Sequence, residues 1–413
     1  MNVNQNSIRN ASENLKGVAL HTPLQKNLAL SEKYQCEVYL KREDLQIVRS
    51  YKIRGAFNKI SSLSNHDLAK GVICASAGNH AQGFAYSCNL LNIQGTVFMP
   101  NTTPKQKVEK VKMFGKNNVK VVLHGDTFDD SYKAAMLVCE SENLTFIHPF
   151  NDFKVIEGQG TVAKEILDEV KDIDYAFFPV GGGGLMAGCS IYFKEVSPKT
   201  KLIAVEPEGA PALKVAMDKG FPVELQDIDK FVDGAAVQRV GDKTFEIIQK
   251  HAEDVILVPE GKVCTTILSL YNEEAIVVEP AGALTVACLD FYAEEIKGKR
   301  IVLVVSGSNN DIDRMQEIKE RSMIYEGLKH FFIIRFPQRP GALKQFVSEI
   351  MGPDDDITRF EFVKKNARES GPALVAIELK KREDYFGLID RMKEYKINFT
   401  EINEDPTLFQ YFV

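Results

Sequence analysis

Lys52 stands in the stretch SYKIRGA, residues 50–56, among small and aromatic residues that suit a buried junction between a strand and a helix. An isolated lysine is ordinarily a solvated surface charge. Burial, however, lowers the pKa of a lysine, and only the neutral amine attacks a carbonyl. Lys52 is therefore a candidate nucleophile, provided that other residues of the chain supply a site around it.

Four consecutive glycines, Gly181–Gly184, separate the apolar stretch YAFFPV from a helix-forming stretch that begins at Leu185. Glycines at such a place let backbone N–H groups turn toward a phosphate at the positive end of a helix dipole. A tight turn without a ligand is the alternative. The loop also satisfies G-x-G-x-x-A, with Glu206 about twenty residues later, as in dinucleotide-binding proteins. The glycines thus predict an anion site but leave the ligand open.

A second junction of a strand and a helix lies at SAGNHAQG, residues 76–83. Backbone N–H groups at such a helix start bind a carboxylate, and the amide of Asn79 donates to a nearby oxygen. Capping of the helix by Ser76 or Asn79 is the simpler interpretation, with His80 as a bystander. No second ligand stands at helical spacing from His80, so we expect no metal there.

From about residue 37 the chain alternates short β-branched runs with amphipathic stretches, which is typical of a βαβ fold. Several of the runs are apolar on both faces, as strands covered by helices must be. The predicted strands are residues 37–41, 71–75, 95–99, 119–123, 175–180, 201–206 and 300–306, and helices are predicted at 104–114 and 153–170.

Composition excludes several classes of protein. The 413 residues suffice for two or three domains, and 51 basic against 57 acidic side chains give a net charge of −6. The chain has no basic stripe for nucleic acid and no apolar run that would span a membrane. Its seven widely spaced cysteines contain no C-x-x-C pair, which indicates reduced thiols. We therefore expect a cytoplasmic protein whose partners are small molecules.

Five motifs occur together in one order: SYKIRGA, SAGNHAQG, GGGGL, VEPAGA at 278–283 and VVSGSN at 304–309. They closely resemble the threonine dehydratases, pyridoxal-phosphate enzymes of the tryptophan-synthase-β fold type, over about residues 5–320. This resemblance excludes the dinucleotide interpretation. It implies a catalytic domain of two subdomains, with mostly parallel sheets covered by helices on both faces. Tyr51 departs from the phenylalanine usual in the family.

The resemblance also implies which residues bind the cofactor, pyridoxal 5′-phosphate. Lys52 would hold its aldehyde covalently, and Asn79 would donate to the ring hydroxyl. Ser306 would face the pyridine nitrogen, where a neutral hydroxyl favours loss of the β-hydroxyl over transamination. The cofactor phosphate would be bound by the backbone amides of Gly181, Gly182, Gly183, Gly184 and Leu185, and the substrate carboxylate by Ser76, Ala77, Gly78, Asn79 and His80.

The implied reaction is the deamination of L-threonine to 2-oxobutanoate and ammonia, the first step of isoleucine biosynthesis, with L-serine as a further substrate. Serine racemases share the scaffold, and the resemblance implies that they have a serine at the position of Ala77, which returns a proton to the opposite face of the substrate. Because alanine cannot donate that proton, we expect elimination to dominate here. A non-catalytic amino-acid sensor is a third possibility. Lys52, Asn79 and Ser306 are all present, which argues against that sensor.

The racemase members bind a divalent cation through a glutamate, a carbonyl and an aspartate, which match Glu206, Ala210 and Ala212 here. Because alanine replaces the aspartate, a hard oxygen ligand is lost, and we expect no magnesium at this place. A monovalent ion at Glu206 is left open.

The tail resembles the ACT-like regulatory domain of biosynthetic threonine dehydratases, most clearly in RFPQRPGAL at 335–343. We predict a catalytic domain over residues 1–320 and a regulatory domain over 321–413, with isoleucine as allosteric effector and a homotetramer as the assembly. A purely assembling domain is the alternative. Pro340 is predicted to start a helix. The further elements predicted in the tail are strands at 357–364, 373–379 and 397–402 and a helix at 383–395.

Overall fold

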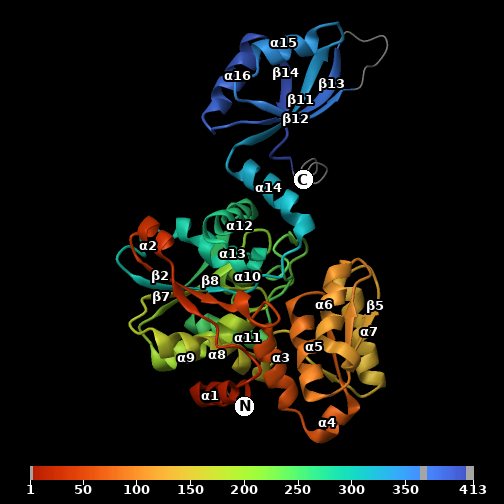
Figure 1. Ribbon diagram of the computed structural model, residues 1–413, viewed down its shortest axis with the longest axis vertical. Helices are drawn as coiled ribbons and strands as arrows, with labels where there is room; N and C mark the ends of the chain where they lie inside the picture. The colour runs from red at the N-terminus through yellow and green to blue at the C-terminus, as the bar shows by residue number, and fades with distance from the viewer. Residues whose placement is uncertain (1–2, 363–369, 406–413) are drawn as a thin grey trace. The chain divides into compact units, whose positions relative to one another are not determined.

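The computed structural model describes residues 3–362 and 370–405 (Figure 1). It divides into two compact units. The larger comprises the described residues up to Glu260 together with Leu270–Asn310, and the smaller comprises Gly261–Ser269 together with the described residues from Asp311 onward. The predicted boundary between residues 320 and 321 falls within helix α14 (Met315–Tyr325) and stays a prediction.

The larger unit contains a six-stranded sheet in the order β1-β2-β10-β7-β8-β9. All neighbours are parallel except β1, which pairs antiparallel with β2. Strand β7 and most of β8 and β10 are buried, as the apolar runs predicted. The strands are β1 (Leu24–Lys26), β2 (Glu37–Arg42), β7 (Tyr175–Pro179), β8 (Lys201–Pro207), β9 (Asp254–Val258) and β10 (Arg300–Val305).

The same unit contains a second, four-stranded parallel sheet in the order β5-β4-β3-β6. Its strands are β3 (Val72–Ala75), β4 (Gly95–Met99), β5 (Val119–Leu123) and β6 (Thr145–Phe146). Helix α3 (Lys52–Ser61) packs against α5 (Asn79–Leu91) of this sheet and against α8 (Phe153–Glu169). Because α8 in turn packs on α9 (Gly184–Val196), α3 joins the helices of the two sheets.

Further helices complete the larger unit. They are α1 (Gln5–Asn14), α2 (Leu28–Tyr34), α4 (Asn65–Lys70), α6 (Lys105–Gly115), α7 (Phe128–Ser141), α10 (Ala212–Lys219), α11 (Asp242–His251), α13 (Pro280–Ala287) and the two ends of α12 (Glu260–Glu274), whose middle belongs to the smaller unit. One core lies around α8, α9 and the large sheet, and another around α5 and the small sheet. Within the described residues, no helix combines the length and the apolar character needed to cross a bilayer.

The smaller unit is built on an antiparallel sheet in the order β12-β13-β11-β14. Phe346 of α15 (Ala342–Glu349) and Leu388 and Met392 of α16 (Asp384–Glu394) form one core with Phe332 and Val375 of the sheet. The strands are β11 (Lys329–Pro337), β12 (Asp356–Phe362), β13 (Ser370–Glu378) and β14 (Asn398–Glu401).

The structure confirms the predicted fold class, with mostly parallel sheets followed by a small α+β unit. It corrects one detail, because α15 begins at Ala342 and its N-cap is Gly341 with φ of 83°, so Pro340 precedes the helix. The strand predicted at 357–364 is observed up to Phe362, and its last two residues lie outside the described part. Strands β1, β6 and β9 were not predicted. The first two are too short to show a pattern, whereas β9 has the β-branched run DVILV, of the kind that predicted the other strands.

Candidate active site

A pocket in the larger unit lies where four chain segments converge. Lys52 begins α3, Asn79 begins α5 after β3, Gly181 follows β7, and Ser306 follows β10. Carboxyl ends of parallel strands are where α/β sheets place their ligands. The remaining lining residues are Tyr51, Pro179, Gly234, Ala235, Glu279 and Ala281. The pocket thus brings together four of the residues predicted from the sequence, although Lys52 and Ser306 are far apart in the chain.

Lys52 is a half-buried amine with an altered acidity. Burial lowers its pKa to about 8, and the nearby carboxyl group of Glu279 partly opposes that shift. The start of α3 is tied to the end of β10, because the Tyr51 N–H donates to the Ser306 carbonyl at 3.3 Å. The amine also lies 5.3 Å from the centre of the Tyr51 ring. A large fraction of this amine is therefore neutral near pH 8, as a nucleophile or base requires.

The glycine loop leaves no room for side chains. A Cβ atom added to Gly181 would lie 2.8 Å from the Ala235 carbonyl oxygen, and one added to Gly182 would lie 2.2 Å from the Phe150 ring. Gly183 has φ of 88°, in the region that favours glycine, and α9 begins at the next residue, Gly184. The loop therefore presents bare backbone at a helix N-terminus, where an anion is favoured.

Glu279 is a pocket residue to which sequence reasoning assigned no role. Its carboxyl group is buried and accepts from Asn79 Nδ2 at 2.6 Å and from the Asn309 backbone N–H at 3.2 Å. Burial raises its pKa to about 7, and the charge of Asp233 adds to the shift. The signal in the sequence was the VEPAGA motif, which places this carboxylate directly before the helix that begins at Pro280.

The residues predicted to bind the substrate carboxylate follow β3. Ser76, Ala77 and Gly78 form the loop that leads into α5, and the Ser76 hydroxyl accepts from the Gly78 N–H at 3.2 Å. His80 is buried and does not line the pocket. Its Nε2 lies 2.9 Å from the Ile147 carbonyl oxygen. Burial lowers the pKa of His80 to about 3, so its ring is neutral. These five residues stay predicted substrate ligands.

Glu206 is engaged locally. Its two carboxyl oxygens accept from the backbone N–H groups of Leu213 and Lys214, at 2.7 and 2.8 Å, in the first turn of α10. Burial raises its pKa to about 8. The Ala210 carbonyl accepts from the Ala212 N–H at 3.0 Å. Both groups considered as cation ligands therefore have structural bonds, and Glu206 acts as a helix cap.

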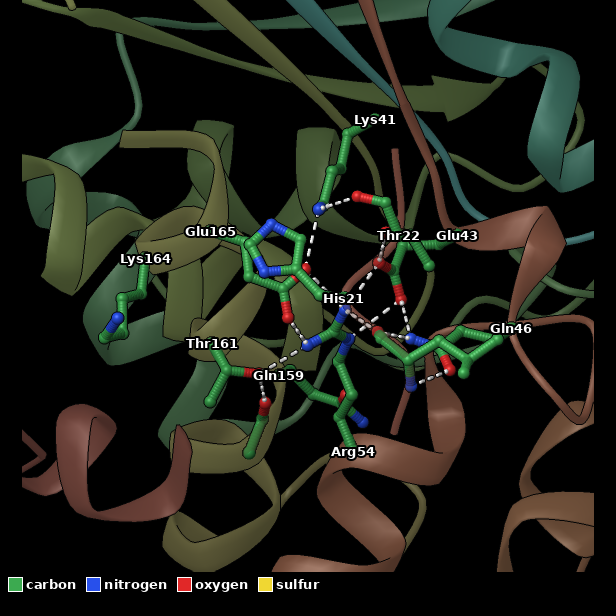
Figure 2. A network of polar contacts seen from close by, with 12 residues as sticks. His21, Thr22, Lys41, Glu43, Gln46, Arg54, Gln159, Thr161, Lys164 and Glu165 are labelled. Carbon is green, nitrogen blue, oxygen red and sulfur yellow. Dashed lines mark hydrogen bonds and ion pairs between the residues drawn. The ribbon is translucent and has the colours of Figure 1, made fainter. Parts of the chain in front are cut away.

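A buried ionic network surrounds Arg54 in the first turn of α3 (Figure 2). Arg54 is only 1% exposed. Its guanidinium donates two hydrogen bonds to Glu43, both at 2.8 Å, and two to Glu165, at 2.6 and 2.9 Å. Lys41 donates to Glu165 at 2.6 Å. Although burial alone would raise the pKa of Glu165, the guanidinium of Arg54 holds it below its usual value. Two cations balance two carboxylates, and the network joins α3 to α8 and to the end of β2.

Comparison with known proteins identifies relatives along the whole chain. Residues 16–307 match the family described as pyridoxal-phosphate-dependent enzymes, and residues 320–413 match the C-terminal regulatory domain of threonine dehydratase. The biosynthetic L-threonine dehydratase of Halalkalibacterium halodurans is 59% identical over 98% of this chain and 97% of its own. The corresponding Bacillus subtilis protein is 56% identical, over 98% of this chain and 96% of its own.

A solved structure supports the same relationship. The processed form of threonine deaminase isoform 2 from Solanum lycopersicum is 40% identical, with a TM-score of 0.74. The match covers 77% of this chain and 87% of that one.

Proposed function

The chain belongs to the family of pyridoxal-phosphate-dependent enzymes, and we propose that it deaminates L-threonine to 2-oxobutanoate and ammonia, with L-serine as a second substrate. The observation that carries this proposal is the amine of Lys52, with its pKa near 8, in one pocket with Asn79, Gly181 and Ser306. The names of the relatives, threonine dehydratases at 50–59% identity, support the choice of substrate.

The pocket fits pyridoxal phosphate in its chemistry. Lys52 would hold the aldehyde, and the loop from Gly181 to Leu185 would hold the phosphate, because a Cβ atom would fill the space beside Gly181 and Gly182. Asn79 would donate to the ring hydroxyl, and Ser306, 2% exposed at the end of β10, would meet the pyridine nitrogen. When bound, the cofactor supplies an electron-accepting ring that stabilises the charge left when a substrate carbon loses its proton.

The residues of the pocket would have separate roles in the reaction. Lys52 would hold the cofactor and would also be the base that takes the α-proton of the substrate, because its pKa, lowered to about 8, increases the neutral fraction of the amine that this task needs. The loop Ser76–Gly78 and the start of α5 would orient the substrate carboxylate. A hydroxyl at Ser306 leaves the ring nitrogen without a full negative partner, which favours early loss of the β-hydroxyl. The product enamine would hydrolyse to the 2-oxoacid and ammonia.

The acidity of Lys52 predicts how the apoprotein takes up its cofactor. The neutral amine attacks the aldehyde, so the rate at which added pyridoxal phosphate produces a visible absorbance band should rise with pH and level off above about pH 8. An ordinary lysine would keep gaining rate toward its own pKa of about 10.4. Stopped-flow absorbance at constant ionic strength measures the profile. A rate still rising steeply well above pH 8 would contradict the burial assigned to this amine.

Regulation is the second part of the proposal. We infer that the smaller unit binds isoleucine and lowers activity at the pocket of the larger unit, in a homotetramer that serves isoleucine biosynthesis. The match of residues 320–413 to a regulatory domain supports this. Such inhibition requires that the effector bind one conformational state better than another, with a coupling free energy of about 1–3 kcal/mol.

Steady-state assays test substrate and effector together. Release of 2-oxobutanoate from threonine should be rapid, and pyruvate should also form from serine, because one methyl group discriminates by only about 1–3 kcal/mol. Isoleucine should raise the threonine concentration needed for half-maximal rate by about 5- to 150-fold. Valine, one methylene smaller, serves as the matched control. A yellow protein that releases no 2-oxoacid from threonine would refute the activity, whereas full activity with isoleucine would refute only the regulation.

A further inference from the structure

Lys110 of α6 makes a contact that helps to orient an amide. Its Nζ lies 3.1 Å from Oδ1 of Asn309, in the loop that follows β10. An ammonium group has only donors, so the end of the Asn309 amide that faces it must be the oxygen. The nitrogen of Asn309 then faces the other way, where it donates to the Val48 carbonyl at 2.9 Å and to Oδ1 of Asn79 at 2.6 Å.

The orientation passes on to Asn79 by the same logic. Because Asn309 offers a nitrogen, the oxygen of Asn79 must face it, and the nitrogen of Asn79 must face the opposite side. There it donates to Oε1 of Glu279 at 2.6 Å. A primary amide carries two N–H groups, and Glu279 takes one of them. The second is available to an oxygen in the pocket that Asn79 lines.

Glu279 is held as a fixed acceptor at the end of this chain of bonds. Its other oxygen accepts from the Asn309 backbone N–H at 3.2 Å. A Cβ atom on Gly307 would lie 2.3 Å from Oε1, so only glycine at that position leaves space for the carboxyl group. Asn309 therefore contacts both partners of the Asn79–Glu279 hydrogen bond, through its side chain and its backbone.

We propose that Lys110, Asn309 and Glu279 are positioning residues that orient Asn79 with an N–H toward the cofactor ring hydroxyl. The proposal rests on the proposed function. It also links the two sheets, because Lys110 lies on a helix of the small sheet and Asn309 follows a strand of the large one. Lys107, one turn earlier on α6, makes a parallel bridge to Asp233 at 2.8 Å. The orientation of the Asn79 N–H thus depends on a contact between the part of the larger unit built on the small sheet and the part built on the large sheet.

Replacing the hydrogen-bond donor at Lys110 by an acceptor tests whether Lys110 and Asn309 orient Asn79. In Lys110→Glu the side chain only accepts, so it opposes the Asn309 oxygen and leaves the orientation of the two amides to the Val48 carbonyl and Glu279 alone. The N–H of Asn79 should then be held less firmly toward the ring hydroxyl. We expect the visible absorbance band of the holoprotein to shift and the dissociation constant of pyridoxal phosphate to rise about tenfold or more. Asn309→Asp should do the same, because a carboxylate cannot donate to Asn79. Absorbance spectra and fluorescence titration of the apoprotein measure both effects.

Two controls isolate the orientation from charge and folding. Lys110→Arg keeps a donor-only side chain and should retain the original spectrum. Lys112→Glu makes the same charge change at an exposed residue of the same helix, paired with Glu109, and should leave the spectrum and affinity unchanged. If Lys110→Glu, Lys112→Glu and the unsubstituted protein had equal spectra and equal affinities for pyridoxal phosphate, the proposed orientation of Asn79 by Lys110 would be wrong. If the unsubstituted protein itself gains no visible band with the cofactor, the proposed function fails instead.

Discussion

Replacement of Lys52 by alanine is expected to abolish the visible absorbance of the bound cofactor and to lower threonine turnover by about 10⁴-fold or more, because one change removes both the nucleophile and the general base. The glycine loop and Ser306 are unchanged, so the cofactor can still bind without its bond to the protein. Absorbance after dialysis and release of 2-oxobutanoate measure the two losses. The expectation follows from the position of the amine in the pocket and its pKa of about 8.

Lys59→Ala is the matched control for this prediction. Lys59 lies on the same helix, where it pairs with Asp152 at 2.9 Å and does not line the pocket. Its loss should leave the absorbance band and turnover close to those of the unsubstituted protein. A Lys52→Ala protein that keeps its band and its turnover would show that another amine carries the chemistry.

Arg54→Met is expected to lower the free energy of unfolding of the larger unit by about 3–5 kcal/mol, because it leaves two buried carboxylates without their shared partner. Glu43 is fully buried and Glu165 is 9% exposed, so water does not replace the lost hydrogen bonds. Lys41 still contacts Glu165, whereas Glu43 keeps its hydrogen bonds from the neutral side chains of Thr22 and Gln46. Denaturant unfolding followed by fluorescence measures the change.

Lys164→Met provides the comparison on α8, the helix that also carries Glu165 (Figure 2). Lys164 pairs with Asp168 at 2.6 Å on the outside of α8, where that carboxylate is half exposed. Exposed pairs of this kind contribute about 0–1 kcal/mol. If Arg54→Met cost no more than Lys164→Met, the buried network would not hold α3 in place, and the position of Lys52 would need another explanation.

Local patterns in the sequence predicted the sheets and the loops at their ends. Strand β7 and the glycines after it are contiguous, so an apolar run followed by Gly181–Gly184 indicates both the element and its anion site. The residues beside Lys52 made its amine a candidate nucleophile, whereas its role at the cofactor was implied only by the resemblance of five motifs spread over the chain. What these patterns share is that their chemical meaning lies within about ten residues of chain, where steric and dipole effects act directly.

Local sequence patterns could not predict which residues position Asn79. Asn79 and Glu279 are 200 positions apart, and Asn309 lies 230 positions from Asn79. The parallel sheets bring their loops together, and no local pattern specifies which loops meet. Glu206 shows the same limit, because its sequence context does not reveal that its carboxyl oxygens accept from the first turn of α10. Sequence patterns predicted chemical types well and partners poorly.

The central claim is that the amine of Lys52 carries the cofactor. Borohydride reduction of the holoprotein, followed by proteolysis and mass spectrometry, locates the attached group directly. The account predicts a single modified peptide containing Lys52 and loss of that modification when threonine is added before reduction. A modification at a different lysine, or none in a protein that turns over threonine, would contradict it.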